Sequence, residues 1–135
     1  MSSPSTPSSP LRALVVEDSP INQKVLTRLL ENEKCVVTHA ADGQQALDRL
    51  AEEEFDVVLM DVQMPVMDGL AATRQIRERE ANSGKRTPIL AVTAGGDRDS
   101  CLQAGMDDFL AKPVRPESLR EKLEGLLGEW PSQRD

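Results

Sequence analysis

Residues 55–70 read FDVVLMDVQMPVMDGL, an apolar run that ends in an aspartate and continues into a segment with proline and glycine. The run from Phe55 to Met60 is apolar except for Asp56, which is typical of a strand buried on both faces of a parallel sheet. Asp61 follows directly, so this strand would deliver a carboxylate to the edge of the sheet. A carboxylate in that place adds nothing to a core, which indicates a role in chemistry.

Similar apolar runs recur along the chain and alternate with amphipathic segments. The segments that predict strands are Leu11 to Val16, Cys35 to Ala40, Phe55 to Met60, Ile89 to Thr93 and Phe109 to Ala111. Strands that alternate with helical patterns are the signature of βαβ units and a parallel sheet. We therefore expect an α/β domain in which five strands alternate with five helices.

The helical segments carry recognisable start signals. Ser19 and Pro20 predict an N-cap followed by proline at the first helical position. A single buried stripe is then expected from residues at helical spacing, namely Ile21, Val25 and Leu29 with Leu26 and Leu30. The fourth helix has to fit between Gly96 and Ala104, so we expect it to be short.

Length and composition indicate one ordinary globular domain. The chain has 135 residues, of which 39% are hydrophobic and 29% charged. Residues 1–10, MSSPSTPSSP, predict a disordered Ser/Pro linker or tail, residues 11–128 the domain, and residues 129–135 a C-terminal tail. The chain lacks a signal-peptide pattern and any apolar stretch of about 20 residues, so we expect a cytoplasmic location.

The charge and the few special residues narrow the function classes. A formal net charge of −7 leaves no basic face, which argues against nucleic-acid binding by this domain. Cys35 and Cys101 lie far apart in sequence and are expected to be reduced thiols. His39 is the only histidine, and we expect it to be a half-exposed packing residue of a strand. A protein partner or a small cation is the better expectation.

Charged residues stand at the ends of three predicted strands. Glu17 and Asp18 end the first, Asp61 ends the third, and Lys112 ends the fifth. Open parallel sheets bind their ligands at the edge formed by the carboxyl ends of the strands. Three acids and a lysine at that edge can hold a divalent metal and a phosphoryl group.

These residues and their surroundings resemble the receiver domain, the phosphoacceptor module of two-component response regulators and hybrid histidine kinases, and most of all the receivers fused to hybrid kinases. The matching segments are Val16 to Ser19, Asn22, Leu59 to Gly69, Pro88 to Ala94 and Ala104 to Pro113. The resemblance implies a doubly wound, flavodoxin-like (βα)5 fold. Its parallel strands would have the order 2-1-3-4-5, with helices on both faces.

The resemblance also implies roles for particular residues. Asp61 would accept a phosphoryl group from a phosphohistidine on a histidine kinase or a histidine phosphotransfer protein in a phosphorelay. One Mg²⁺ would be held by Glu17, Asp18, Asp61 and the backbone carbonyl of Gln63. The domain itself would not be an enzyme, because the chain has no phosphorylatable helix histidine and no ATP lid. It would meet a membrane only as part of a hybrid sensor kinase.

Lys112 and Thr93 would contact the phosphoryl group, and Thr93 and Phe109 would change conformation when it is bound. Lys112 supplies a positive charge and Thr93 a hydroxyl donor for the phosphoryl oxygens. Thr93 and Phe109 would form the switch, although Phe109 lacks the hydroxyl of the tyrosine often found at its position. The resemblance also implies a cis peptide bond between Lys112 and Pro113.

One segment departs from the family. Only Gly95 stands between Ala94 and Gly96, where the family usually carries about three more residues, close to one helical turn. We therefore expect phosphorylation chemistry to be intact while output through the fourth helix and fifth strand is altered.

Two other functions compete with this interpretation. A phosphatase of the haloacid-dehalogenase type also forms an aspartyl phosphate, but it needs a second aspartate two residues later, where Gln63 stands. A degenerate receiver that only binds proteins is the second alternative. The intact acids, threonine and lysine argue against this alternative, but the short loop keeps it open.

Overall fold

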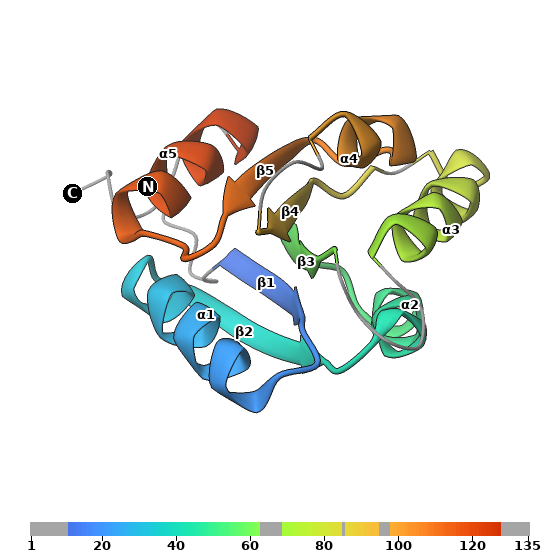
Figure 1. Ribbon diagram of the computed structural model, residues 1–135. Coiled ribbons are helices and arrows are strands. Elements are labelled where there is room, and N and C mark those ends of the chain that lie inside the picture. The colour runs from blue at the N-terminus through green and yellow to red at the C-terminus, as the bar shows by residue number, and fades with distance from the viewer. Residues whose placement is uncertain (1–10, 63–68, 85, 95–97, 128–135) are drawn as a thin grey trace, which may run out of the picture.

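Five parallel strands and five helices alternate in the computed structural model, which describes residues 11–62, 69–84, 86–94 and 98–127 (Figure 1). The strands are β1 (Leu11–Val16), β2 (Cys35–Ala40), β3 (Val57–Asp61), β4 (Ile89–Thr93) and β5 (Asp108–Ala111). The helices are α1 (Pro20–Asn32), α2 (Gly43–Glu52), α3 (Gly69–Ala81), α4 (Arg98–Ala104) and α5 (Pro116–Leu127). The hydrogen-bonded strand order β2-β1-β3-β4-β5 confirms the predicted doubly wound fold.

The helices cover both faces of the sheet. Helices α1 and α5 lie on one face, and α2, α3 and α4 lie on the other (Figure 1). Strand β1 shows how the two cores are separated, since Leu14 and Val16 pack toward α2 and α3 whereas Ala13 and Val15 pack toward α1 and α5. All five residues of β3 are buried, as expected for a central strand with apolar side chains on both faces.

Two strands, β3 and β5, have bounds that differ from the prediction. Strand β3 begins at Val57 rather than Phe55, because Asp56 is hydrogen-bonded to Arg12 at the start of β1. The Arg12 main-chain N–H donates to the Asp56 carboxylate at 2.7 Å, and the Asp56 N–H donates to the Arg12 carbonyl at 2.8 Å. The strand ends at Asp61 itself. Strand β5 begins one residue earlier than predicted, at Asp108.

The start of α1 was predicted well, but its buried face was not. The Ser19 side chain accepts the Asn22 N–H and Pro20 is the first helical residue, as expected. Leu26 and Leu30 are buried, yet Ile21 is 74% exposed and Val25 is 49% exposed. Neighbouring helix residues point about 100° apart, so the row that contains Leu26 and Leu30 is buried, whereas in the neighbouring row only Leu29 packs partly against the core.

Some predicted features fall outside the described residues. These are the two tails, Gln63, and the shortened loop at residues 95–97. The fourth helix is short, as predicted, with seven residues; its Cys101 is buried but Leu102 is 44% exposed. Within the described ranges, no helix is both long and apolar enough to cross a membrane.

Candidate functional site

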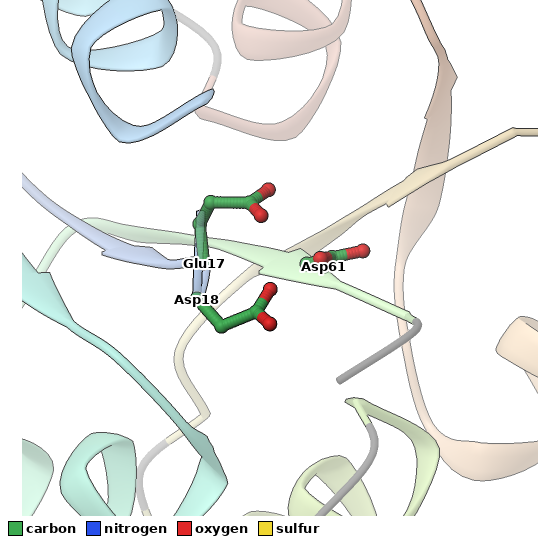
Figure 2. Close-up of side chains that lie close together, drawn as sticks. All are labelled: Glu17, Asp18 and Asp61. Carbon is green, nitrogen blue, oxygen red and sulfur yellow. The ribbon is translucent and has the colours of Figure 1, made fainter. Parts of the chain in front are cut away.

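Three carboxylates meet at the carboxyl edge of the sheet. Glu17 and Asp18 follow β1, and Asp61 is the last residue of β3. One carboxylate oxygen from each residue lies within 4.8 Å of the others, and Figure 2 shows the three side chains facing a common space. Glu17 and Asp61 are 1% and 3% exposed, whereas Asp18 is exposed to solvent. The predicted acidic cluster is therefore formed, with one member open to an incoming group.

The main chain fixes Glu17 in place. Its N–H donates to the Ala40 carbonyl at 3.0 Å, and its carbonyl accepts from the Gln23 side chain at 2.5 Å. Its carboxylate oxygen Oε2 accepts the Ser19 N–H at 3.2 Å, while Oε1 is buried without a hydrogen-bond partner among the described residues. A buried carboxylate oxygen that lacks a donor is costly to maintain. A cation would satisfy it.

The electrostatics of the cluster show the same imbalance. Burial raises the pKa of the Glu17 carboxyl above its ordinary value, and the negative charge of Asp61 raises it further. The Ser19 N–H and the ammonium of Lys112 act in the opposite direction and lower that pKa. The net direction of the pKa is upward, so burial and the neighbouring charge of Asp61 together outweigh the groups that stabilise the Glu17 carboxylate.

Lys112 reaches the cluster from β5. Its Nζ lies 3.3 Å from Asp61 Oδ1, and its N–H donates to the Thr93 carbonyl at 2.8 Å. The peptide bond between Lys112 and Pro113 is cis, as the family resemblance implied. A fixed ammonium next to Asp61 is suited to a phosphoryl oxygen as well as to the carboxylate.

The two predicted switch residues lie on neighbouring strands. Thr93 is the last residue of β4 and is 2% exposed, and its Cα is paired with that of Ala111 on β5. Phe109 is partly buried against the cluster of apolar residues beneath α3 and α4. The Lys122 ammonium of α5 lies 5.3 Å from the centre of the Phe109 ring and 3.0 Å from Asp108 Oδ1. The Lys122 contact was not predicted, because it joins residues that are distant in sequence.

The donor set fits a hard divalent cation. Mg²⁺ prefers carboxylate and carbonyl oxygens and keeps several waters, and here two buried carboxylates and one exposed one converge around an unsatisfied oxygen. Gln63, whose carbonyl was the fourth predicted ligand, lies outside the described residues. The acidic cluster can hold a metal ion with the three ligands that the structure describes.

Gly69 lies in a segment that carries the family resemblance, but no role was assigned to it from the sequence. It begins α3, and its N–H donates to the Val62 carbonyl at 3.0 Å, immediately after Asp61. The signal in the sequence was a glycine at the start of a helix, directly after the Asp61 segment, because glycine loses more conformational freedom in a helix than alanine does.

Comparison with known proteins agrees with this geometry. Residues 13–124 match the family model of the response regulator receiver domain. The chain is 45% identical over 122 residues to hybrid signal transduction histidine kinase I of Dictyostelium discoideum, a match that covers 84% of this chain. It is 40% identical over 129 residues to the osmosensing histidine protein kinase SLN1 of Saccharomyces cerevisiae, which covers 89% of this chain. These matches span only 7% and 10% of the two kinases.

Solved structures show the same fold with relevant ligands. The receiver domain of sensor histidine kinase PA1611 from Pseudomonas aeruginosa PAO1, with a magnesium ion coordinated in its active site cleft, is 44% identical, with a TM-score of 0.81 over 90% of this chain and 100% of that one. The receiver domain of Ssk1 from Saccharomyces cerevisiae, in complex with the histidine phosphotransfer protein Ypd1, is 34% identical, with a TM-score of 0.80 over 87% of this chain and 90% of that one.

The family model covers most of the chain, and the relatives align over more than four-fifths of it. The strand order and the acidic edge of the sheet are those that the family resemblance implied. The chain belongs to the response regulator receiver domain family.

Proposed function

We propose that Asp61 accepts a phosphoryl group from a phosphohistidine of a partner protein and so carries one step of a phosphorelay. The observation that supports this most is the environment of Asp61: its carboxylate is nearly buried, two further acids lie close to it, and the ammonium of Lys112 lies 3.3 Å from it. Phosphoryl transfer needs little beyond positioning and charge stabilisation, and this site supplies both.

Each residue has a defined part in the transfer. An Asp61 oxygen attacks phosphorus, so that an O–P bond forms while the N–P bond to the imidazole breaks and the imidazole nitrogen keeps the electron pair. Lys112 moves from pairing with Asp61 to pairing with a phosphoryl oxygen, and the Thr93 hydroxyl donates to another. Glu17, Asp18 and Asp61 would hold Mg²⁺ together with the Gln63 carbonyl. When bound, Mg²⁺ supplies positive charge that offsets the repulsion between the acids and the phosphoryl group.

The partner class follows from the same site and from the relatives. The Ypd1 complex shows that a similar receiver binds a histidine phosphotransfer protein. In this chain the helix next to the acids, α1, exposes Ile21 and Val25, which are four residues apart and therefore on one face. An apolar patch beside a phosphoryl acceptor suits a transient protein partner. A cytoplasmic location and an altered output through the short loop remain predictions of this proposal.

A small-molecule phosphodonor tests the proposal without the natural partner. With acetyl phosphate and Mg²⁺, the intact protein should gain about 80 Da, the mass of one phosphoryl group. Asp61→Asn should gain nothing, and removal of Mg²⁺ with a chelator should abolish the gain in the wild type. A receiver that serves only as a protein-binding module would show no gain in either protein, and that result would refute the proposal.

A further inference from the structure

Gly69 places the start of α3 directly against the end of β3. The residue is buried, and its N–H donates to the carbonyl of Val62, the residue after Asp61. The first turn of α3 therefore rests on the main chain that carries the Asp61 side chain, on the same edge of the sheet as the carboxylates in Figure 2.

The contact leaves no space for a side chain at position 69. A Cβ there would lie 2.4 Å from the Asp61 carbonyl oxygen, 2.9 Å from Met60 Cγ and 3.0 Å from Val62 Cα. The Met60 side chain could rotate away, but the other two atoms belong to the main chain. Any residue except glycine would have to push the backbone of Asp61 and the first turn of α3 apart.

Helix propensity does not explain this glycine. Glycine is less favourable than alanine within a helix, because it loses more conformational freedom on folding. Gly125 in α5 provides a comparison, since no atom outside its own stretch of helix lies within 4 Å of the place where its Cβ would be. A residue that opposes local propensity and also lies against the main chain of a reacting residue is expected at a functional site.

We propose that Gly69 is a positioning residue, which fixes the main chain of Asp61 so that its carboxylate lies beside both Glu17 and Lys112. This inference rests on the proposed function of Asp61. If a Cβ were added at position 69, its distance to the Asp61 carbonyl oxygen would have to increase from 2.4 Å to at least 3.0 Å. A misplacement of about 1 Å in a reacting group can reduce a rate about 100-fold.

The test compares Gly69→Ala with the matched control Gly125→Ala in the full chain. Initial rates of phosphoryl uptake are measured over a range of acetyl phosphate concentrations, and Tm is measured with and without Mg²⁺. We expect Gly69→Ala to lower the maximal rate about 10-fold to 100-fold, with an unchanged half-saturating donor concentration, and to lose most of the rise in Tm caused by Mg²⁺. Gly125→Ala should keep the wild-type maximal rate and the wild-type rise in Tm on addition of Mg²⁺.

A purely structural role would give a different pattern. It would lower the Tm of Gly69→Ala equally with and without Mg²⁺ and leave the maximal rate unchanged, and this pattern would overturn the inference. If Gly69→Ala does not fold, the test uses the NMR resonance of the Gly69 amide in the wild-type protein. That resonance should shift when Mg²⁺ is added, and an unmoved resonance beside shifted Glu17 and Asp61 signals would overturn the inference.

Failure of the proposed function of Asp61 can be distinguished from failure of the positioning role of Gly69. If the wild type takes up no phosphoryl group, the phosphoacceptor role of Asp61 is wrong. A crystal structure of Gly69→Ala then tests the positioning role alone. Displacement of the Asp61 main chain away from Lys112 supports the inference, and superposition of Asp61 on its wild-type position overturns it.

Discussion

Replacement of Glu17 by glutamine should stabilise the protein in the absence of divalent metal. The carboxylate of Glu17 is buried, one of its oxygens has no hydrogen-bond partner among the described residues, and two further carboxylates lie within 4.8 Å. Glutamine has the same shape, its carbonyl oxygen can keep the hydrogen bond from the Ser19 N–H, and its amide can donate to Asp61. The substitution therefore removes a repulsion and preserves the packing.

The size of the effect can be worked from the distances. Two unit charges separated by 4.8 Å repel by about 1 kcal/mol in a water-like environment and by about 3.5 kcal/mol at an effective dielectric constant of about 20. Lys112 offsets part of this repulsion, so the net gain for Glu17→Gln should be about 1–3 kcal/mol at pH 7. For a domain of 135 residues, this corresponds to a rise in Tm of at least about 3 °C.

The sign of the pH dependence follows from the raised pKa. The Glu17 carboxyl binds its proton more tightly in the folded state than in the unfolded state. Its contribution to stability is thus present at low pH and is lost as the pH rises through the folded-state pKa. The difference in Tm between Glu17→Gln and the wild type should consequently be largest near neutral pH and should shrink as the pH falls below that pKa.

Magnesium should narrow the difference in Tm between the two proteins. A ligand at about 100 times its dissociation constant stabilises the folded state by about 2.7 kcal/mol, and the variant has one carboxylate fewer with which to bind it. The assay is thermal unfolding of both proteins in chelator and in excess Mg²⁺, from about pH 4, near the ordinary pKa of Glu, to about pH 8. A lower Tm for Glu17→Gln in chelator, or a difference that changes with neither pH nor Mg²⁺, would refute this reasoning.

Three further predictions test other parts of the structure. Lys112→Met should reduce the rate of phosphoryl uptake by about 100-fold, because it removes the ammonium that lies 3.3 Å from Asp61, and a rate within twofold of the wild type would contradict the role of Lys112. The Arg77 side chain is 13% exposed and donates to Gly105, Thr87 and Asp107. Arg77→Ala should therefore lower the free energy of unfolding in urea by about 3 kcal/mol. Arg86 is an exposed partner of the same aspartate, so Arg86→Ala should lower it little. Equal losses in the two arginine variants would show that this network is not held by its buried member. Burial and the charges of Glu33 and Asp56 raise the pKa of the Cys35 thiol to about 12, so Cys35 should resist alkylation in the folded protein at pH 8 and react after unfolding, and rapid labelling of the folded protein would show that the site opens.

Much of the fold could be predicted because its signals are local. A strand such as β3 is buried on both faces, so an apolar run marks it without any knowledge of its neighbours. Because the carboxyl ends of parallel strands meet at one edge, Asp61, Glu17 and Lys112 could be placed together from three separate segments. The structure brings them within contact distance.

The features that were missed depend on tertiary geometry. Helix α1 has two adjacent apolar rows, and only the packing of the helix on the sheet decides that Leu26 and Leu30 are buried while Ile21 and Val25 are exposed. Glu17 and Asp18 are neighbours in sequence, yet one is buried and the other exposed. The contact of Gly69 with Asp61 joins a helix start to a strand end, and no periodicity in the sequence encodes such an approach.

The central claim is that Asp61 itself receives the phosphoryl group from a phosphohistidine. The most direct measurement incubates the protein with a phosphorylated histidine phosphotransfer protein and Mg²⁺, reduces the acyl phosphate with borohydride, and maps the product by peptide mass spectrometry. Reduction converts a phosphorylated aspartate to homoserine, so the account predicts homoserine at position 61 and none in Asp61→Asn. Homoserine at Asp18 or another acid, or unmodified Asp61 after the donor has lost its phosphoryl group to this protein, would contradict it.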